Sequence, residues 1–246
     1  MIETTTSADG TTVAFERAGH GDPLLILGGA FNTRTSATGL ASLLSPFFTT
    51  FTIDRRGRGD SGLTLPYAVE REIEDVAAVL RAAGGEAHVY GHSSGAVLAL
   101  EAAASGLPFV RLASYEPPYG DDPSVMSREV AAALAAGNPA EAVLAFLGGG
   151  RPGLQESPWW PHMVDNAATL PHDLALLADG AVPVERLERI PIPTLVIGGG
   201  DSEEWALRAV DAVAAAVPHA TRHIIDGQDH GVSDEALAPV LEEYFG

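Results

Sequence analysis

The chain of 246 residues contains no cysteine and no lysine. The absence of cysteine excludes disulfide bonds, thiolate catalysis and zinc sites built on sulfur ligands. The 14 basic residues are all arginines, they face 33 acidic residues, and the formal net charge is −19. Because such a charge repels polyanions, we expect neither nucleic acid nor an anionic membrane surface as a partner.

Long apolar runs are also absent. No stretch approaches the ~18 residues that a membrane helix needs, and Met1–Gly10 lacks the basic and apolar segments of a signal peptide. We therefore expect a cytoplasmic protein. With 46% hydrophobic and 19% charged residues, the composition indicates one packed globule rather than disorder. It leaves open whether the protein is a monomer or a homodimer.

Short apolar runs rich in β-branched residues alternate with longer segments rich in alanine and leucine, a pattern typical of a parallel sheet covered by helices. The predicted strands are Thr11–Arg17, Leu24–Leu27, Phe48–Ile53, Ala87–Tyr90, Val110–Tyr115, Thr194–Ile197 and Arg222–Ile225. The predicted helices are Val69–Ala83, Ala96–Ala104 and Ser233–Tyr244. Between Glu116 and Ile190 there is no convincing strand and proline is frequent, which indicates a helical insertion over the carboxyl edge of the sheet.

The segment Gly91-His92-Ser93-Ser94-Gly95 fits the pattern G-x-S-x-G. In this pattern the serine occupies a strained turn between a strand and a helix, and the glycines avoid collisions with neighbouring backbone. The pentapeptide alone can arise by chance in a glycine-rich chain. Its context is more specific, because a predicted strand leads in and an apolar helix leads out. Ser93 is therefore the predicted nucleophile.

A serine nucleophile needs a base and a group that orients the base. His230 follows the last predicted strand, which favours it as the general base over the other histidines. Asp201 follows the strand Thr194–Ile197 and is our preferred acid. Glu116, directly after the strand Val110–Tyr115, is the alternative, whereas Asp229 is expected to be a solvated neighbour of His230.

Two backbone N–H groups are candidates for an oxyanion hole. Ser94 follows the nucleophile at the start of a predicted helix, and Ala30 lies in the glycine-containing loop Gly28-Gly29-Ala30-Phe31 after an early strand. The N–H of Phe31 is a weaker alternative to that of Ala30.

Together these residues resemble the α/β-hydrolase superfamily over essentially the whole chain. The stretch Asp54–Ser61 is similar to the D-x-R-G-x-G-x-S turn of that family, although many members have His-Gly where this chain has Gly28-Gly29. The resemblance implies an α/β fold with a mostly parallel eight-stranded sheet and helices on both faces. It implies a hydrolase core of residues 1–118 and 191–246 with a helical lid insertion at 119–190.

Other local signals carry less functional weight. We expect Arg55, Arg56 and Arg58 to form a solvated loop cluster, in view of the acidic chain as a whole. Trp159 and Trp160 lie in the predicted lid, and lids over a catalytic serine commonly present apolar side chains to the substrate. Trp159, Trp160 and Phe31 are therefore the predicted substrate-binding residues.

The predicted activity is acyl transfer to water from an ester, thioester or lactone of a hydrophobic small molecule, without a cofactor or a metal. One alternative is a non-hydrolytic cyclase or acyltransferase of small-molecule biosynthesis that uses the same pocket. Another is a ligand-binding, receptor-like protein with vestigial turnover. The identity of the substrate and its leaving group stays open at this point.

Overall fold

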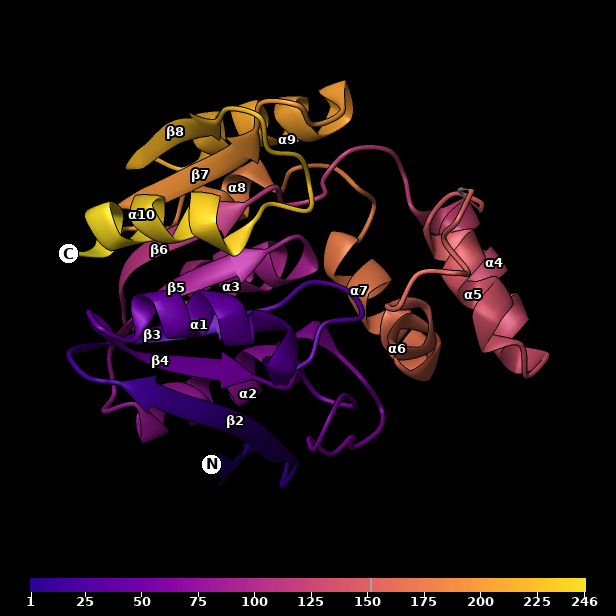
Figure 1. Ribbon diagram of the computed structural model, residues 1–246, viewed down its shortest axis with the longest axis horizontal. Helices are drawn as coiled ribbons and strands as arrows, with labels where there is room; N and C mark the ends of the chain where they lie inside the picture. Colours follow the sequence, from indigo (N-terminus) through magenta and orange to yellow (C-terminus); the bar gives the residue numbers. More distant parts are fainter. Residues whose placement is uncertain (151) are drawn as a thin grey trace.

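A computed structural model describes residues 1–150 and 152–246 of the chain, as one eight-stranded sheet with helices around it (Figure 1). The strands are β1 (Ile2–Thr6), β2 (Thr12–Gly19), β3 (Asp22–Leu27), β4 (Phe48–Ile53), β5 (Ala87–His92), β6 (Phe109–Tyr115), β7 (Thr194–Gly199) and β8 (Ala220–Ile225). Their spatial order is β1-β2-β4-β3-β5-β6-β7-β8.

The sheet is mostly parallel, as predicted. Strands β4, β3, β5, β6, β7 and β8 pair in parallel, whereas β2 pairs antiparallel with both β1 and β4. The residue pattern predicted the other seven strands but not β1, which the resemblance alone implied. β1 is an edge strand whose residues are all exposed or half-buried, so no buried apolar face marked it in the sequence.

Alternate residues of the central strands enter two separate cores, because successive side chains of a strand point to opposite faces. On one face, Leu25, Val89 and Leu112 pack with α2 (Val69–Ala82), α3 (Ser94–Ala104) and α9 (Glu204–Ala216), together with α8 (Val184–Leu187). On the other face, Leu24 and Tyr90 pack with α1 (Thr38–Leu44) and α10 (Asp234–Phe245). The predicted helices on both faces are thus confirmed.

Between β6 and β7 the described residues form helices and loops without a strand. The helices are α4 (Ser124–Ala135), α5 (Pro139–Phe146), α6 (Trp160–Asp165), the short 3₁₀ helix η2 (Ala167–Thr169), α7 (Leu170–Leu177) and α8. Figure 1 shows α4 to α7 beyond the carboxyl ends of β5 and β7. We call residues 119–190 the insertion. Its apolar residues form a third core, built around Val130, Val143 and Leu170.

Membrane-spanning geometry is not found in the described part of the chain, where every helix is too short or too polar to cross a bilayer.

Candidate active site

Ser93 occupies the tight turn between β5 and α3. Its backbone has φ 55° and ψ −124°, a left-handed conformation that non-glycine residues rarely adopt and that costs of order 1–3 kcal/mol. The flanking glycines make the turn possible. A Cβ on Gly91 would collide with the backbone of Gly95 and Ala96, and one on Gly95 would collide with the carbonyl of Leu27. The predicted strained turn at Ser93, between a strand and a helix, is confirmed.

His230 lies in the loop between β8 and α10, with its side chain 44% exposed. Its Nδ1 is 2.7 Å from Oε2 of Glu116, whose side chain is fully buried. An ionised carboxylate can only accept, so Nδ1 carries the proton in this pair. The second ring nitrogen, Nε2, is then free to accept a proton.

Glu116 follows β6 directly and has φ 42°. Its Oε1 accepts hydrogen bonds from the Gly199 N–H at 2.7 Å and from the Ser202 hydroxyl at 2.5 Å. Burial alone would raise the pKa of Glu116. The hydrogen bonds from His230, Gly199 and Ser202 outweigh burial and lower that pKa below its usual value. Glu116 is therefore an anion at neutral pH.

The prediction that Asp201 orients His230 is wrong, because His230 is bonded to Glu116. β7 ends at Gly199, and by residue 201 the chain has turned away from the sheet edge, leaving the Asp201 side chain exposed. Its backbone N–H donates to the carbonyl of Gln228 at 2.8 Å. Asp201 thus holds the loop that carries His230 through its backbone rather than through its carboxylate.

Two aromatic side chains flank the ring of His230. His92 meets it edge to face at a centroid distance of 5.2 Å, and Trp205 lies at 6.3 Å. Burial lowers the pKa of His92 to about 3, and the neighbouring His230 adds to the effect. His92 is therefore neutral at physiological pH and places no positive charge beside the candidate base. Sequence reasoning gave Trp205 no role.

The loop after β3 passes directly against Ser93. A Cβ added to Gly29 would lie 2.9 Å from Ser93 Cβ and 3.1 Å from the His92 carbonyl. Ala30 is the next residue, and Phe31 follows with φ 65°. From the other side, Ser94 opens α3, where the first N–H groups of a helix have no partner within the helix. The two candidate oxyanion residues thus lie on the two segments that meet at Ser93.

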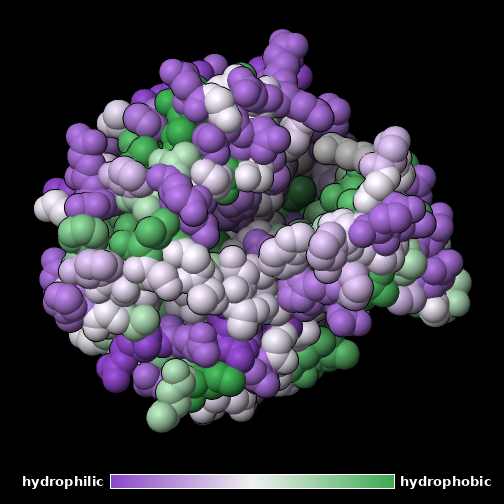
Figure 2. Space-filling model, in the orientation of Figure 1, coloured by the Kyte–Doolittle hydropathy of each residue, from purple (hydrophilic) through white to green (hydrophobic). Residues whose placement is uncertain are grey.

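Apolar side chains of the insertion approach the same loop. Ala30 and Phe31 pack against the third core, and the ring of Phe31 meets that of Phe146 edge to face at 5.4 Å. Figure 2 shows the surface hollowed between the core of the protein and the insertion. Trp160 is half-buried against this apolar cluster, whereas Trp159 is 55% exposed and contacts His162. Of the three predicted substrate-binding residues, Phe31 and Trp160 therefore lie at the apolar cluster, whereas Trp159 lies largely in solvent.

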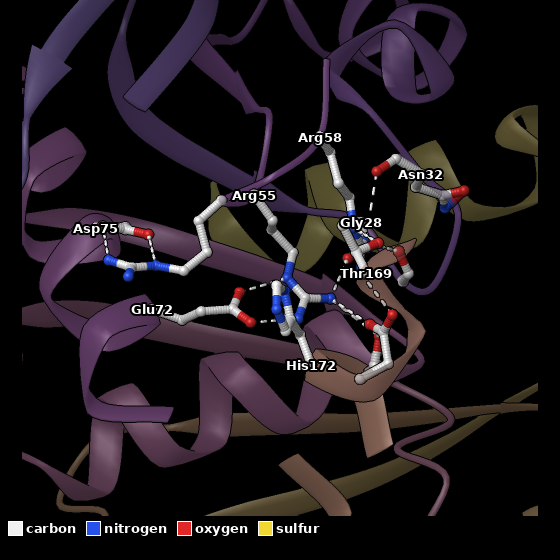
Figure 3. A network of polar contacts seen from close by, with 12 residues as sticks. Gly28, Asn32, Arg55, Arg58, Glu72, Asp75, Thr169 and His172 are labelled. Carbon is white, nitrogen blue, oxygen red and sulfur yellow. Dashed lines mark hydrogen bonds and ion pairs between the residues drawn. The ribbon is translucent and has the colours of Figure 1, made fainter. Parts of the chain in front are cut away.

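The three arginines after β4 are buried, so the expectation of a solvated cluster is wrong. Arg55, Arg56 and Arg58 are each at most 3% exposed. Arg55 pairs with Glu72 at 2.7 Å and with Asp173 at 2.9 Å, and Arg58 pairs with Asp173 at 2.6 Å. Figure 3 shows the guanidinium groups of Arg55 and Arg58 between α2 and the insertion.

Arg56 pairs with two other carboxylates. It bonds Asp75 at 2.7 Å and Asp9 at 3.1 Å. Buried charges persist only when they are paired in this way. The net charge of the chain gives no information on such local ion pairs.

In residues 1–150 and 152–246, no group of three or more histidine, aspartate or glutamate side chains could hold a metal ion.

Comparison with known proteins gives a consistent result. The model of the alpha/beta hydrolase family matches residues 18–243. N-formylmaleamate deformylase from Pseudomonas putida is 35% identical over 117 residues, which make up 46% of this chain and 44% of that enzyme. The match thus spans less than half the length of the deformylase.

Solved structures match over nearly the whole chain. An alpha/beta hydrolase from Sphaerobacter thermophilus is 47% identical with a TM-score of 0.95, and the match covers 99% of this chain and 100% of that chain. A thermophilic esterase from Thermogutta terrifontis is 20% identical with a TM-score of 0.81, covering 100% of this chain and 98% of that chain. At that identity the esterase shows the shared fold alone.

Proposed function

The chain belongs to the alpha/beta hydrolase family, and from this premise we propose that it is a serine hydrolase with Ser93 as nucleophile. The proposed substrate is an ester, thioester or lactone of a hydrophobic small molecule, cleaved through an acyl-enzyme. The observation that carries the proposal is the 2.7 Å contact between His230 and Glu116 at the sheet edge where Ser93 occupies its strained turn.

In the proposed mechanism the hydroxyl of Ser93 attacks the substrate carbonyl carbon while Nε2 of His230 takes the hydroxyl proton. Glu116 holds the proton on Nδ1 and stabilises the imidazolium, a role that its low pKa and three hydrogen bonds support. The tetrahedral intermediate then collapses, and His230 returns the proton to the leaving oxygen or sulfur.

The second half of the reaction repeats this chemistry with water. His230 takes a proton from water, the resulting hydroxide attacks the acyl carbon, and Ser93 leaves with the proton as the acid is released. The N–H groups of Ala30 and Ser94 bind the oxyanion in both halves, since the segments that carry them meet at Ser93. No step requires a metal or a cofactor.

The preference for a hydrophobic acyl group rests on the apolar cluster beside the oxyanion loop. Phe31 and Phe146 pack edge to face there, and Trp160 and Met163 pack on the same core. We propose that this cluster of the insertion acts as a lid that covers the acyl chain and limits the access of water.

An amide is a second candidate substrate, because the deformylase similar to this chain acts by its name on an N-formyl compound. The same nucleophile, base and oxyanion donors serve ester and amide, so the substrate panel below includes an N-formyl amide.

The test is a hydrolysis panel with the wild-type protein and Ser93→Ala, using 4-nitrophenyl esters of increasing chain length, a thioester, a lactone and an N-formyl amide. The proposal predicts turnover by the wild type and its loss in a folded Ser93→Ala protein. Retained turnover in that variant would refute the assignment of Ser93. Reaction in H₂¹⁸O identifies a cyclase or acyltransferase, whose product carries no ¹⁸O. Ligand binding without turnover of any substrate would indicate the receptor-like alternative.

A further inference from the structure

Arg58 makes a contact with the oxyanion loop in addition to its ion pair. Its Nη1 donates to the carbonyl oxygen of Gly29 at 2.7 Å, while Nη2 donates to Asp173 and Nε donates to Thr169 at 3.0 Å. The Arg58 side chain is 1% exposed. Every nitrogen is therefore engaged, and the group is fixed in one orientation.

The carbonyl of Gly29 belongs to the same peptide group as the N–H of Ala30. In a planar trans peptide these two bonds point in opposite directions, so a group that fixes the carbonyl also fixes the direction of the N–H. A charged donor on the carbonyl oxygen also polarises the peptide and makes its N–H a stronger donor. Arg58 therefore orients and polarises the peptide group whose N–H, on Ala30, is the first candidate oxyanion donor.

Ser94, which carries the second candidate donor, is hydrogen-bonded to Asp173, the carboxylate that also pairs with Arg58. Oδ1 of Asp173 accepts a 2.7 Å hydrogen bond from the hydroxyl of Ser94, while Oδ2 accepts from Arg58. Arg55 donates to both Ser94 Oγ and Asp173 Oδ1, at 3.0 and 2.9 Å. Asp173 is 1% exposed and lies on α7 of the insertion. One buried carboxylate thus connects the two backbone segments that carry Ala30 and Ser94.

We propose that Asp173 and Arg58 are positioning residues that aim the oxyanion donors at Ala30 and Ser94 and strengthen the donor at Ala30, so that α7 of the insertion forms part of the catalytic machinery. This inference rests on the proposed serine hydrolase function. It assigns to the insertion a second task besides covering the substrate.

Anchoring of α7 to the core is the competing explanation for these contacts. Anchoring predicts that loss of the pair lowers stability and leaves the chemistry of the remaining folded enzyme unchanged. Positioning predicts a loss of kcat with little change in KM, because the oxyanion forms only as the transition state is approached. The two explanations therefore differ in kinetics rather than in stability.

The chain offers a matched control in Arg56. This arginine is also buried and doubly paired, with Asp75 and Asp9, and its other hydrogen bond goes to the carbonyl of Arg71. Among the described residues it forms no hydrogen bond or ion pair with Gly29 or Ser94. Arg56→Met removes a comparable ion pair without touching the proposed oxyanion hole.

The experiment compares the wild type with Arg58→Met, Asp173→Asn and Arg56→Met, each assayed at least 10 °C below its own unfolding midpoint. The substrates are a 4-nitrophenyl ester and the matching thionoester, in which C=S replaces C=O. Sulfur accepts hydrogen bonds weakly, so the ratio of kcat/KM for ester over thionoester reports the oxyanion donors. Asp173→Asn keeps the size of the side chain and carries the test if Arg58→Met does not fold.

Removal of one oxyanion donor typically costs about 10²- to 10³-fold in kcat, and a misaimed donor costs part of this. We expect kcat to fall by about 10- to 100-fold in Arg58→Met and Asp173→Asn, with KM within about twofold and a clear fall in the ester-to-thionoester ratio. Arg56→Met is expected to keep both the ratio and kcat within about threefold.

An unchanged ester-to-thionoester ratio in Arg58→Met or Asp173→Asn overturns the inference, even if stability falls. This failure is distinct from failure of the proposed function. If the wild type turns over and Ser93→Ala does not, only the positioning role is lost. If the wild type turns over no ester, thioester, lactone or amide of the hydrolysis panel, the hydrolase proposal falls and the positioning role falls with it.

Discussion

Replacement of Glu116 by glutamine tests the acid assignment, and the structure predicts how the variant fails. Oε1 of Glu116 receives two hydrogen bonds, from the Gly199 N–H and the Ser202 hydroxyl. In Glu116→Gln the single amide oxygen will occupy that position, because an NH₂ group there would face two donors. The NH₂ group then faces His230 and donates to its Nδ1.

A donor at Nδ1 forces the proton of the neutral imidazole onto Nε2, the nitrogen that accepts the proton of Ser93 in the proposed mechanism. The corresponding change in a well-studied serine protease lowers kcat by about 10⁴-fold through the wrong tautomer. We therefore expect a loss of about 10³- to 10⁴-fold here, equivalent to ~4–5.5 kcal/mol in the activation free energy. The fold is expected to persist, since the two bonds to the amide oxygen remain.

The matched control is Asp201→Asn, which changes an exposed carboxylate and leaves the backbone bond to Gln228 in place. We expect its kcat to stay within about twofold of wild type. The assay is burst and steady-state hydrolysis of a 4-nitrophenyl ester, with circular dichroism as the check on folding. A loss in Asp201→Asn together with an active Glu116→Gln would refute the reasoning.

Three further predictions follow from the same geometry. Gly29→Ala places a Cβ 2.9 Å from that of Ser93, so kcat is expected to fall at least tenfold in ester hydrolysis, and wild-type rates would contradict the close approach. Burial would raise the pKa of Asp173, but the charges of Arg58 and Arg55 outweigh it and lower the pKa below its usual value. The ionised form of Asp173 therefore adds stability above about pH 4 that is lost as the pH falls further. Urea unfolding at pH 7, 5 and 3.5 should show a steeper loss for wild type than for Asp173→Asn; parallel curves would contradict the sign. Phe146→Ala removes the edge-to-face partner of Phe31 and is expected to raise KM for long-chain esters several-fold more than for acetates, whereas a uniform change across chain lengths would place this ring outside the acyl site.

Sequence reasoning located the parts of the site that depend on local pattern. The strained turn at Ser93 can be predicted because glycines, a preceding strand and a following helix lie within a few positions of one another. His230 can be selected as the candidate base because it follows the last strand of the sheet. The Thr-rich strand β1 escaped notice, because it is an exposed edge without an apolar face.

The acid could not be chosen from the sequence because the choice depends on how two strand ends lie in space. Glu116 and Asp201 both follow strands that end at the same edge. The left-handed backbone at Glu116 and the donors at Gly199 and Ser202 place Glu116 against His230. These features bring together residues more than 80 positions apart.

The burial of Arg55 and Arg58 was not predicted, for a related reason. Arg55 and Arg58 pair with Asp173, which lies more than 100 positions later in the chain, in the insertion. Net charge averages over the whole molecule and gives no information on such pairings. A basic cluster in an acidic chain was therefore expected at the surface, although its partners surround it in the core.

The proposed function requires that Ser93 is an activated nucleophile and that His230 is its base. Intact-protein mass spectrometry after exposure to a fluorophosphonate tests it most directly, with Ser93→Ala and His230→Ala as controls. We expect a single covalent adduct on the wild-type protein and none on either variant at the same exposure. A well-folded wild-type protein without an adduct, or an adduct that persists in Ser93→Ala, would contradict it.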